Sequence, residues 1–182
     1  MTMHHIGSVT VTGSSTTTMD FANIPQTFTH LQIKTFLRMQ ANQGVPYDLT
    51  ITVNGANPTQ FAFHRLSGNG AGASSANYIN DNLFRVPLIV PNAFHTSNVF
   101  GTAVIDILDY NNASKGKTLR AIGGQDVNGG TEPNAGWANL TSSMWSSLSA
   151  ITSLSFASFG NFAIGSRVDL YGITSNPIAT GA

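Results

Sequence analysis

Hydrophobic and polar residues alternate along much of the chain with a period of two, which is typical of β-strands that bury one face. The clearest run lies at residues 27–39, where Leu31, Ile33 and Leu37 alternate with polar residues such as Gln32 and Lys34. Other segments repeat this alternation or are rich in Thr and Val. Together they predict about nine or ten strands, within residues 6–12, 16–22, 27–39, 48–53, 61–66, 84–90, 98–110, 116–122, 150–159 and 167–173.

The segments between these strands carry turn residues and show no sustained helical period. Residues 67–80 are expected to form a loop around a glycine-rich core, and residues 123–136 are expected to form a second long polar loop. A single helical turn is expected within residues 137–145. Pro87 lies inside its strand and predicts an edge position, because proline cannot donate to the strand ladder.

This pattern predicts an all-β protein: a two-sheet antiparallel β-sandwich, jelly-roll-like, with little helix. Residues 1–182 are expected to form a single domain, with 1–12 and 174–182 acting as interface arms. The predicted core consists of apolar positions on the buried faces of the strands: Leu31, Ile33, Leu37, Ile51, Val53, Val104, Ile107, Leu108, Ile151, Leu154, Leu170 and Ile173.

Composition narrows the range of functions. Charged residues make up only 9% of the chain, the formal net charge is zero, and Thr, Ser, Asn and Gly together supply 73 of 182 residues. Eight basic residues are a poor basis for nucleic-acid binding, which requires cations that neutralise phosphates. No apolar run is long enough for a membrane span. The chain has no cysteine, so it forms no disulfide. A neutral surface favours a protein that works within an assembly.

Candidate catalytic and cofactor motifs are weak. Gly68 and Gly70 match part of a dinucleotide fingerprint, but no helix pattern follows them, so no cofactor is expected. The five histidines lack metal-ligand spacing; His30 and His64 lie within strands where they can meet across a sheet. Asp106 and Asp169 are carboxylates that adjacent strands can bring together, as a polysaccharide hydrolase requires. The more economical interpretation is a protein without catalytic, cofactor or metal residues.

Four large aromatic residues are candidate contacts for a glycan or a protein partner. Tyr47, Tyr78, Trp137 and Trp145 lie in or beside the expected loops. Exposed aromatic rings at such positions can stack on the faces of sugars.

Three stretches resemble virion structural proteins of tailed bacteriophages and cyanophages. They are 21–33, which contains Ile-Pro-Gln-Thr-Phe-Thr-His-Leu, then 104–110, and finally Leu-Tyr-Gly-Ile at 170–173. The resemblance runs from about residue 16 to residue 174. It implies a non-enzymatic protein located in the virion, most readily a capsid decoration (cement) protein that contacts the major capsid protein. No catalytic residue follows from it.

Two further functions stay open at this stage. The chain can be a tail or fibre component that binds a host-surface glycan through loops 66–80 and 123–136, or a polysaccharide hydrolase. Self-association is expected because the chain is neutral and its first strand lacks the charges and prolines that protect sheet edges. The resemblance favours a homotrimer, because capsid cement proteins often occupy three-fold positions.

Overall fold

The computed structural model describes residues 2–40, 47–55, 60–126 and 136–174. These residues form twelve strands and no helix, so none of them forms a helix long and apolar enough to cross a membrane. The strands are β1 (Thr2–Thr10), β2 (Thr18–Phe21), β3 (His30–Leu37), β4 (Tyr47–Val53), β5 (Phe61–Gly68), β6 (Ala73–Asp81), β7 (Phe84–Val90), β8 (Gly101–Leu108), β9 (Lys117–Asp126), β10 (Gly136–Trp145), β11 (Leu154–Ala157) and β12 (Arg167–Thr174).

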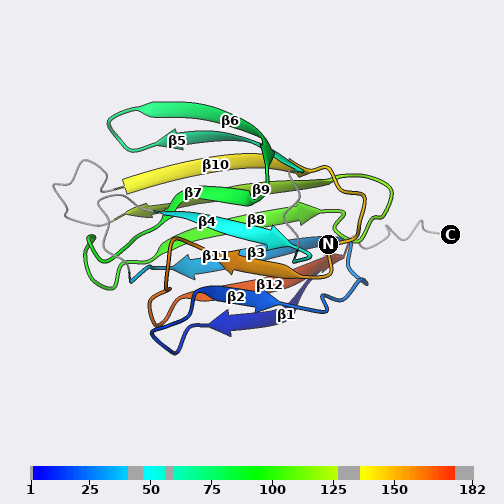
Figure 1. Ribbon diagram of the computed structural model, residues 1–182, viewed down its shortest axis with the longest axis horizontal. Coiled ribbons are helices and arrows are strands. Elements are labelled where there is room, and N and C mark those ends of the chain that lie inside the picture. Colours follow the sequence, from blue (N-terminus) through cyan, green and yellow to red (C-terminus); the bar gives the residue numbers. More distant parts are fainter. Residues whose placement is uncertain (1, 41–46, 56–59, 127–135, 175–182) are drawn as a thin grey trace.

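The strands form two antiparallel sheets that pack face to face, which confirms the predicted sandwich (Figure 1). The larger sheet has the order β1-β12-β3-β8-β9-β10-β5-β6, and the smaller has the order β2-β11-β4-β7. We call the face of the larger sheet that packs on the smaller one its inner face, and the opposite face its outer face.

The topology is that of a jelly roll with two inserted hairpins. When β5, β6, β9 and β10 are set aside, the remaining eight strands form two four-stranded sheets, β1-β12-β3-β8 and β2-β11-β4-β7. Numbered in chain order, these sheets read 1-8-3-6 and 2-7-4-5, the pairing of a jelly roll. The hairpins β9–β10 and β5–β6 are added beside β8 and extend the larger sheet beyond the smaller one (Figure 1).

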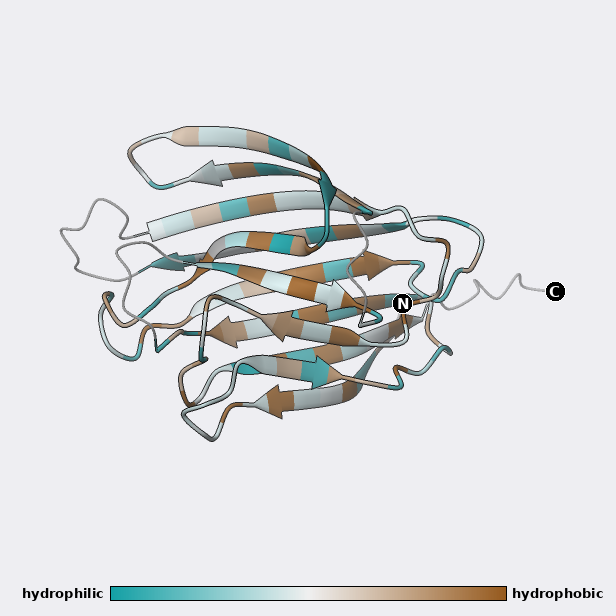
Figure 2. Ribbon diagram, viewed as in Figure 1, coloured by the Kyte–Doolittle hydropathy of each residue, from teal (hydrophilic) through white to brown (hydrophobic). Residues whose placement is uncertain are grey.

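The core lies between the sheets and follows the predicted alternation, visible as alternating bands along the strands (Figure 2). Ten of the twelve predicted core positions are buried. Val104 and Leu108 are the exceptions: both project from β8 on the outer face and are half-buried. Their strand carries apolar residues on both faces, so its sequence did not identify the inner one.

Two other local predictions were wrong. The glycine-rich segment is a tight hairpin turn at residues 69–72, and most of the expected loop that follows is strand β6. The expected helical turn at 137–145 is strand β10. Both segments pair with β5, so they are strands because of the sheet they join. The second expected loop is also shorter than predicted, because residues 123–126 belong to β9 and residue 136 begins β10. Residues 127–135 of that loop and 175–182 of the C-terminal arm lie outside the described residues.

Candidate interaction surface

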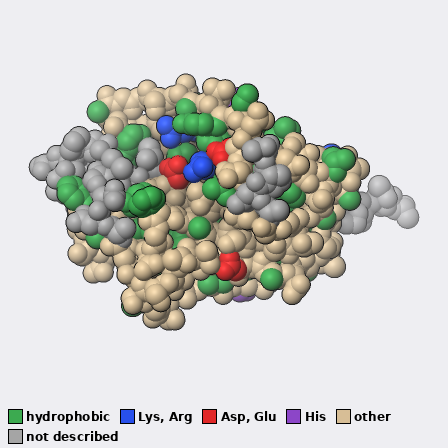
Figure 3. Space-filling model, in the orientation of Figure 1, with side chains coloured by type: hydrophobic (Ala, Val, Ile, Leu, Met, Phe, Trp, Pro, Cys, Tyr) green, Lys and Arg blue, Asp and Glu red, His purple; other side chains and the backbone are tan. Residues whose placement is uncertain are grey.

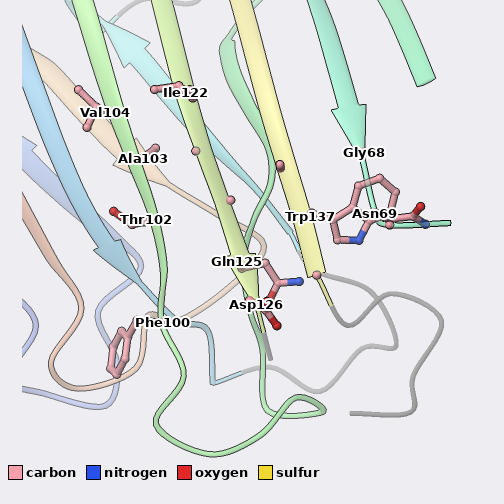
Figure 4. A pocket seen from close by; sticks show the side chains of 15 residues that line it. Gly68, Asn69, Phe100, Thr102, Ala103, Val104, Ile122, Gln125, Asp126 and Trp137 are labelled. Atoms are coloured by element: carbon pink, nitrogen blue, oxygen red, sulfur yellow. The ribbon is translucent and has the colours of Figure 1, made fainter. Parts of the chain in front are cut away.

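A shallow groove of about 870 Å³ lies at the end of the larger sheet where β8, β9 and β10 meet the β5–β6 turn (Figure 4). Its rim combines Asn69 and Gly70 from that turn with Asp126 and Trp137 from the ends of β9 and β10. The structure therefore brings together the described parts of the two segments that were proposed to contact a glycan.

Two adjacent glycines form part of the floor of this groove because the neighbouring strands approach them closely. A Cβ atom on Gly123 would lie 2.7 Å from the carbonyl oxygen of Thr102. A Cβ atom on Gly124 would lie within 3.0 Å of the carbonyl oxygen of Trp137. Gly124 pairs with the outward residues Thr102 and Ala138, so no side chain rises into the groove at this position and a ligand can reach the sheet backbone.

Two further grooves, of about 570 and 400 Å³, continue the depression across the outer face toward β6. The first two grooves share Gly68 and Ile122, and the last two share Leu66 and Leu140. The three grooves thus form one continuous trough over β9, β10, β5 and β6.

Apolar side chains line the middle of the trough. Leu66, Leu140, Ile122 and Val104 are direct cross-strand neighbours on β5, β10, β9 and β8, and we call them the apolar row. The first three are 59%, 50% and 64% exposed. Contiguous apolar surface of this kind marks an interaction site more often than isolated exposed residues do.

Strand β10 shows why this row is exposed. Its inward positions hold polar residues, Asn139, Thr141 and Ser143, whereas Leu140 and Met144 point outward and are each 50% exposed. A strand at a water-covered surface would carry the opposite arrangement. Strand β10 therefore has an inverted polarity: it buries polar side chains and exposes apolar ones.

A second row of outward side chains crosses the sheet beside the apolar row. Its members face one another in register on all eight strands, and every one can form hydrogen bonds. We call this the polar row: Asn77, His64, Ser142, Arg120, Asp106, Gln32, Tyr171 and His5.

The two halves of the polar row differ in whether their side chains contact one another. Gln32 Nε2 donates to Asp106 Oδ1 at 2.9 Å, and Tyr171 contacts His5 with ring centroids 5.4 Å apart. Within the described residues, no hydrogen bond or ion pair engages the side chains of His64 or Arg120. That end of the row, nearest to β6, is available to a partner.

Strands β5, β9 and β10 bury several polar groups that lack hydrogen-bond partners among the described residues. Seven residues of β5, β9 and β10 carry buried side-chain atoms that form no hydrogen bond with any described residue: Arg65, Ser67, Gln125, Trp137, Asn139, Thr141 and Trp145. Buried polar atoms are normally hydrogen-bonded, in many cases to ordered water. The buried polar groups of the inserted hairpins are therefore satisfied by hydrogen bonds only in part within the described residues.

Three of the four predicted contact residues retain some exposure. Trp137 lies on the rim of the first groove. Tyr78 is 49% exposed on β6, with its ring stacked on Phe63. Tyr47 begins β4 and is partly exposed.

The fourth predicted contact residue does not reach the surface. Trp145 is buried, with its ring stacked on Phe61 and close to the ammonium group of Lys117, so its prediction as a surface contact was wrong. Trp145 is the last residue of β10 and points to the inner face. The sequence pattern did not predict this strand.

The structure separates the residues that a hydrolase or metal site would need together. Asp106 and Asp169 lie on β8 and β12, with β3 between them, so the expected adjacency was wrong. His30 and His64 lie on β3 and β5, which are separated by β8, β9 and β10. In the described part of the chain, no group of three or more His, Cys, Asp or Glu could hold a metal ion.

Two aspartates that pair with arginines have pKa values below the ordinary one. Burial raises the pKa of Asp169, but hydrogen bonds from Arg167 and Ser8 and the charge of Arg167 outweigh it, so this pKa lies below its ordinary value. The pKa of Asp81 is lowered in the same way: burial opposes the shift, and the hydrogen bond and charge of Arg85 dominate. Charged side chains are few on the face shown in Figure 3, which is the side of the smaller sheet.

No family model, no curated protein and no solved structure matches the chain. The outer-face trough, the apolar row and the polar row are therefore the features from which a function can be argued.

Proposed function

We propose that the chain is a non-enzymatic structural protein of a phage virion, a decoration (cement) protein that attaches to the major capsid protein by its outer face. The inverted polarity of β10 is the observation that carries this proposal. Exposure of the apolar side chains of Leu140 and Met144 to water is unfavourable, and their burial by a partner would stabilise the complex. The resemblance to virion proteins supplies the particle as the setting.

Other properties of the molecule agree with such a role. The jelly roll occurs in viral capsid proteins as well as in lectins, so the fold is compatible with the proposal without selecting it. Polar contacts of the attached face would be formed mainly by uncharged side chains and by Arg120 and Asp106, which have opposite charges and face each other on β9 and β8. An interface of this kind depends less on ionic strength than one built from many ion pairs.

The test replaces one residue of the apolar row in the phage that encodes the chain. Leu140→Asp places a charge in the proposed interface, at a position exposed enough to be tolerated in the free subunit. Ile164→Asp is the matched control, since Ile164 is 61% exposed and lies outside the row.

We expect purified particles to lose most of the chain with Leu140→Asp and to retain it with Ile164→Asp, as measured by quantitative mass spectrometry. Particles without the chain should release their genome at a lower temperature. Full retention of the Leu140→Asp variant, or absence of the wild-type chain from purified particles, would refute the proposal.

The first groove favours a second candidate function, a tail or fibre component that binds a host-surface glycan. Trp137 supplies an aromatic ring, Asn69 an amide and Asp126 a carboxylate, all on the rim of one groove. Glycan-array binding that disappears in Trp137→Ala, together with loss of adsorption to the host, would select this function over attachment to the capsid.

A further inference from the structure

The two sheets have four edge strands in the described part of the chain, and three of them carry features that block pairing with another strand. Strand β2 has only four residues and includes Asp20. Strand β7 contains Arg85 and Pro87. Strand β1 is interrupted by a bulge between His5 and Gly7. Short length, charge, proline and bulges are the usual ways in which proteins protect exposed edges.

Strand β6 has none of these features along most of its length. It has nine residues, contains no Lys, Arg or Pro, and carries its only charge at its last position, Asp81. Its ladder with β5 is regular from Ala73 to Tyr78, and the irregularity in their pairing comes only after that. Six consecutive residues therefore present a regular backbone edge.

The β5–β6 hairpin projects beyond the smaller sheet, so no described strand covers either face of β6 or pairs with its outer edge (Figure 1). Seven of its nine residues are exposed, and Ile79 is 72% exposed. An approaching strand meets only the small or uncharged side chains of residues 73–80. Before Asp81, no side chain of β6 carries a charge that would repel a strand of the same sequence.

We propose that β6 pairs antiparallel with β6 of a second copy of this chain, across a two-fold axis perpendicular to the sheet. The two larger sheets then join into one continuous sheet. Antiparallel pairing about this axis leaves both outer faces on the same side, so the apolar and polar rows of the two copies flank a common centre. A two-fold axis places identical residues near each other, so a charged edge would repel its own copy. The uncharged edge of β6 avoids this repulsion and therefore favours a second copy as the partner.

The proposal differs from the expected trimer and does not rest on attachment to a particle. A trimer closed through sheet edges would require β6 of one copy to pair with β1 of the next, a head-to-tail contact. Substitutions on β1 would then weaken association as much as substitutions on β6. The two arrangements can therefore be separated with purified protein.

Because the chain has no cysteine, a single introduced cysteine reports on proximity without interference. We would prepare Ser74→Cys, Ser75→Cys, Ala76→Cys and Asn77→Cys one at a time and oxidise each variant mildly. Near the two-fold axis a residue lies opposite itself, so at least one variant should form a disulfide-linked dimer in high yield. Met3→Cys on β1 is the control and should remain monomeric on a denaturing gel.

A charge substitution tests the same contact at equilibrium. Ser75→Lys should raise the dissociation constant of the dimer about tenfold or more in sedimentation equilibrium, because two like charges enter one interface. Met3→Lys should leave the dissociation constant unchanged. A wild-type chain that stays monomeric at all concentrations, a trimer weakened equally by both lysines, or the absence of any β6 cross-link would overturn the proposal.

Discussion

Replacement of Ile107 by alanine tests whether the jelly-roll core carries the stability of the molecule. Ile107 projects inward from β8, is fully buried and belongs to the main hydrophobic cluster. The substitution removes three carbon atoms, which corresponds to roughly 2.4 kcal/mol at about 0.8 kcal/mol for each buried methylene. The cavity that remains adds to this loss, so the free energy of unfolding should fall by about 2–5 kcal/mol.

The neighbouring residue supplies a matched control. Leu108 follows Ile107 on the same strand but points to the outer face, where it is half-buried. Leu108→Ala removes the same number of carbon atoms and should cost about half as much or less, because part of the side chain is already in water. Urea unfolding followed by tryptophan fluorescence measures both variants, with buried Trp145 as an internal probe.

The comparison can refute the reasoning directly. If Ile107→Ala lowers the free energy of unfolding by less than about 1 kcal/mol, the position is not packed as described. If Leu108→Ala costs more than Ile107→Ala, the inner and outer faces of β8 have been exchanged. A changed slope of the unfolding free energy against urea concentration would instead show that the variant altered the cooperativity of unfolding.

Three further outcomes are expected. Gly172→Ala should destabilise the fold by about 1–3 kcal/mol because a Cβ atom there would lie within 3.0 Å of the Phe28 ring, and adding Phe28→Ala should recover part of that loss in a double-mutant cycle of unfolding free energies. The depressed pKa of Asp169 contributes stability that is fully present above its unfolded value, near 3.8, and is lost as the pH falls through the lower folded value; Arg167→Ala should raise the folded pKa measured by NMR and reduce this dependence. Burial lowers the pKa of Lys117, so stability should rise with pH between that lowered value and 10.5, and Lys117→Met should abolish this rise in unfolding experiments across the alkaline range.

The jelly-roll strands could be predicted because their alternation reflects one buried face. Leu31 and Ile33 on β3 lie in the core, as the pattern required, and Pro87 marks an edge strand. Gly172, within the predicted last strand, is covered by the Phe28 ring. At these positions the local signal and the tertiary environment agree.

The inserted hairpins could not be predicted by the same rule. Strand β10 buries Asn139 and Thr141 and exposes Leu140. A prediction that assigns apolar residues to the buried face therefore does not identify this strand. Strand β6 is rich in Ala, Ser and Asn, which have weak preference for strands, and it is extended because β5 pairs with it. The apolar and polar rows were missed for the same reason, since the register of these hairpins aligns their members across the sheet.

The insertion points of the hairpins bear on how such a molecule can change in evolution. The chain leaves the jelly roll after Val53 and returns at Phe84, which lies directly opposite Ile51 in the pairing of β4 with β7. A short turn at this point would reconnect the same two strands, so the β5–β6 hairpin is an insertion between consecutive jelly-roll strands, joined to their core through Phe61. Selection for a new binding partner can therefore rewrite the hairpin's length and sequence while the eight scaffold strands keep theirs.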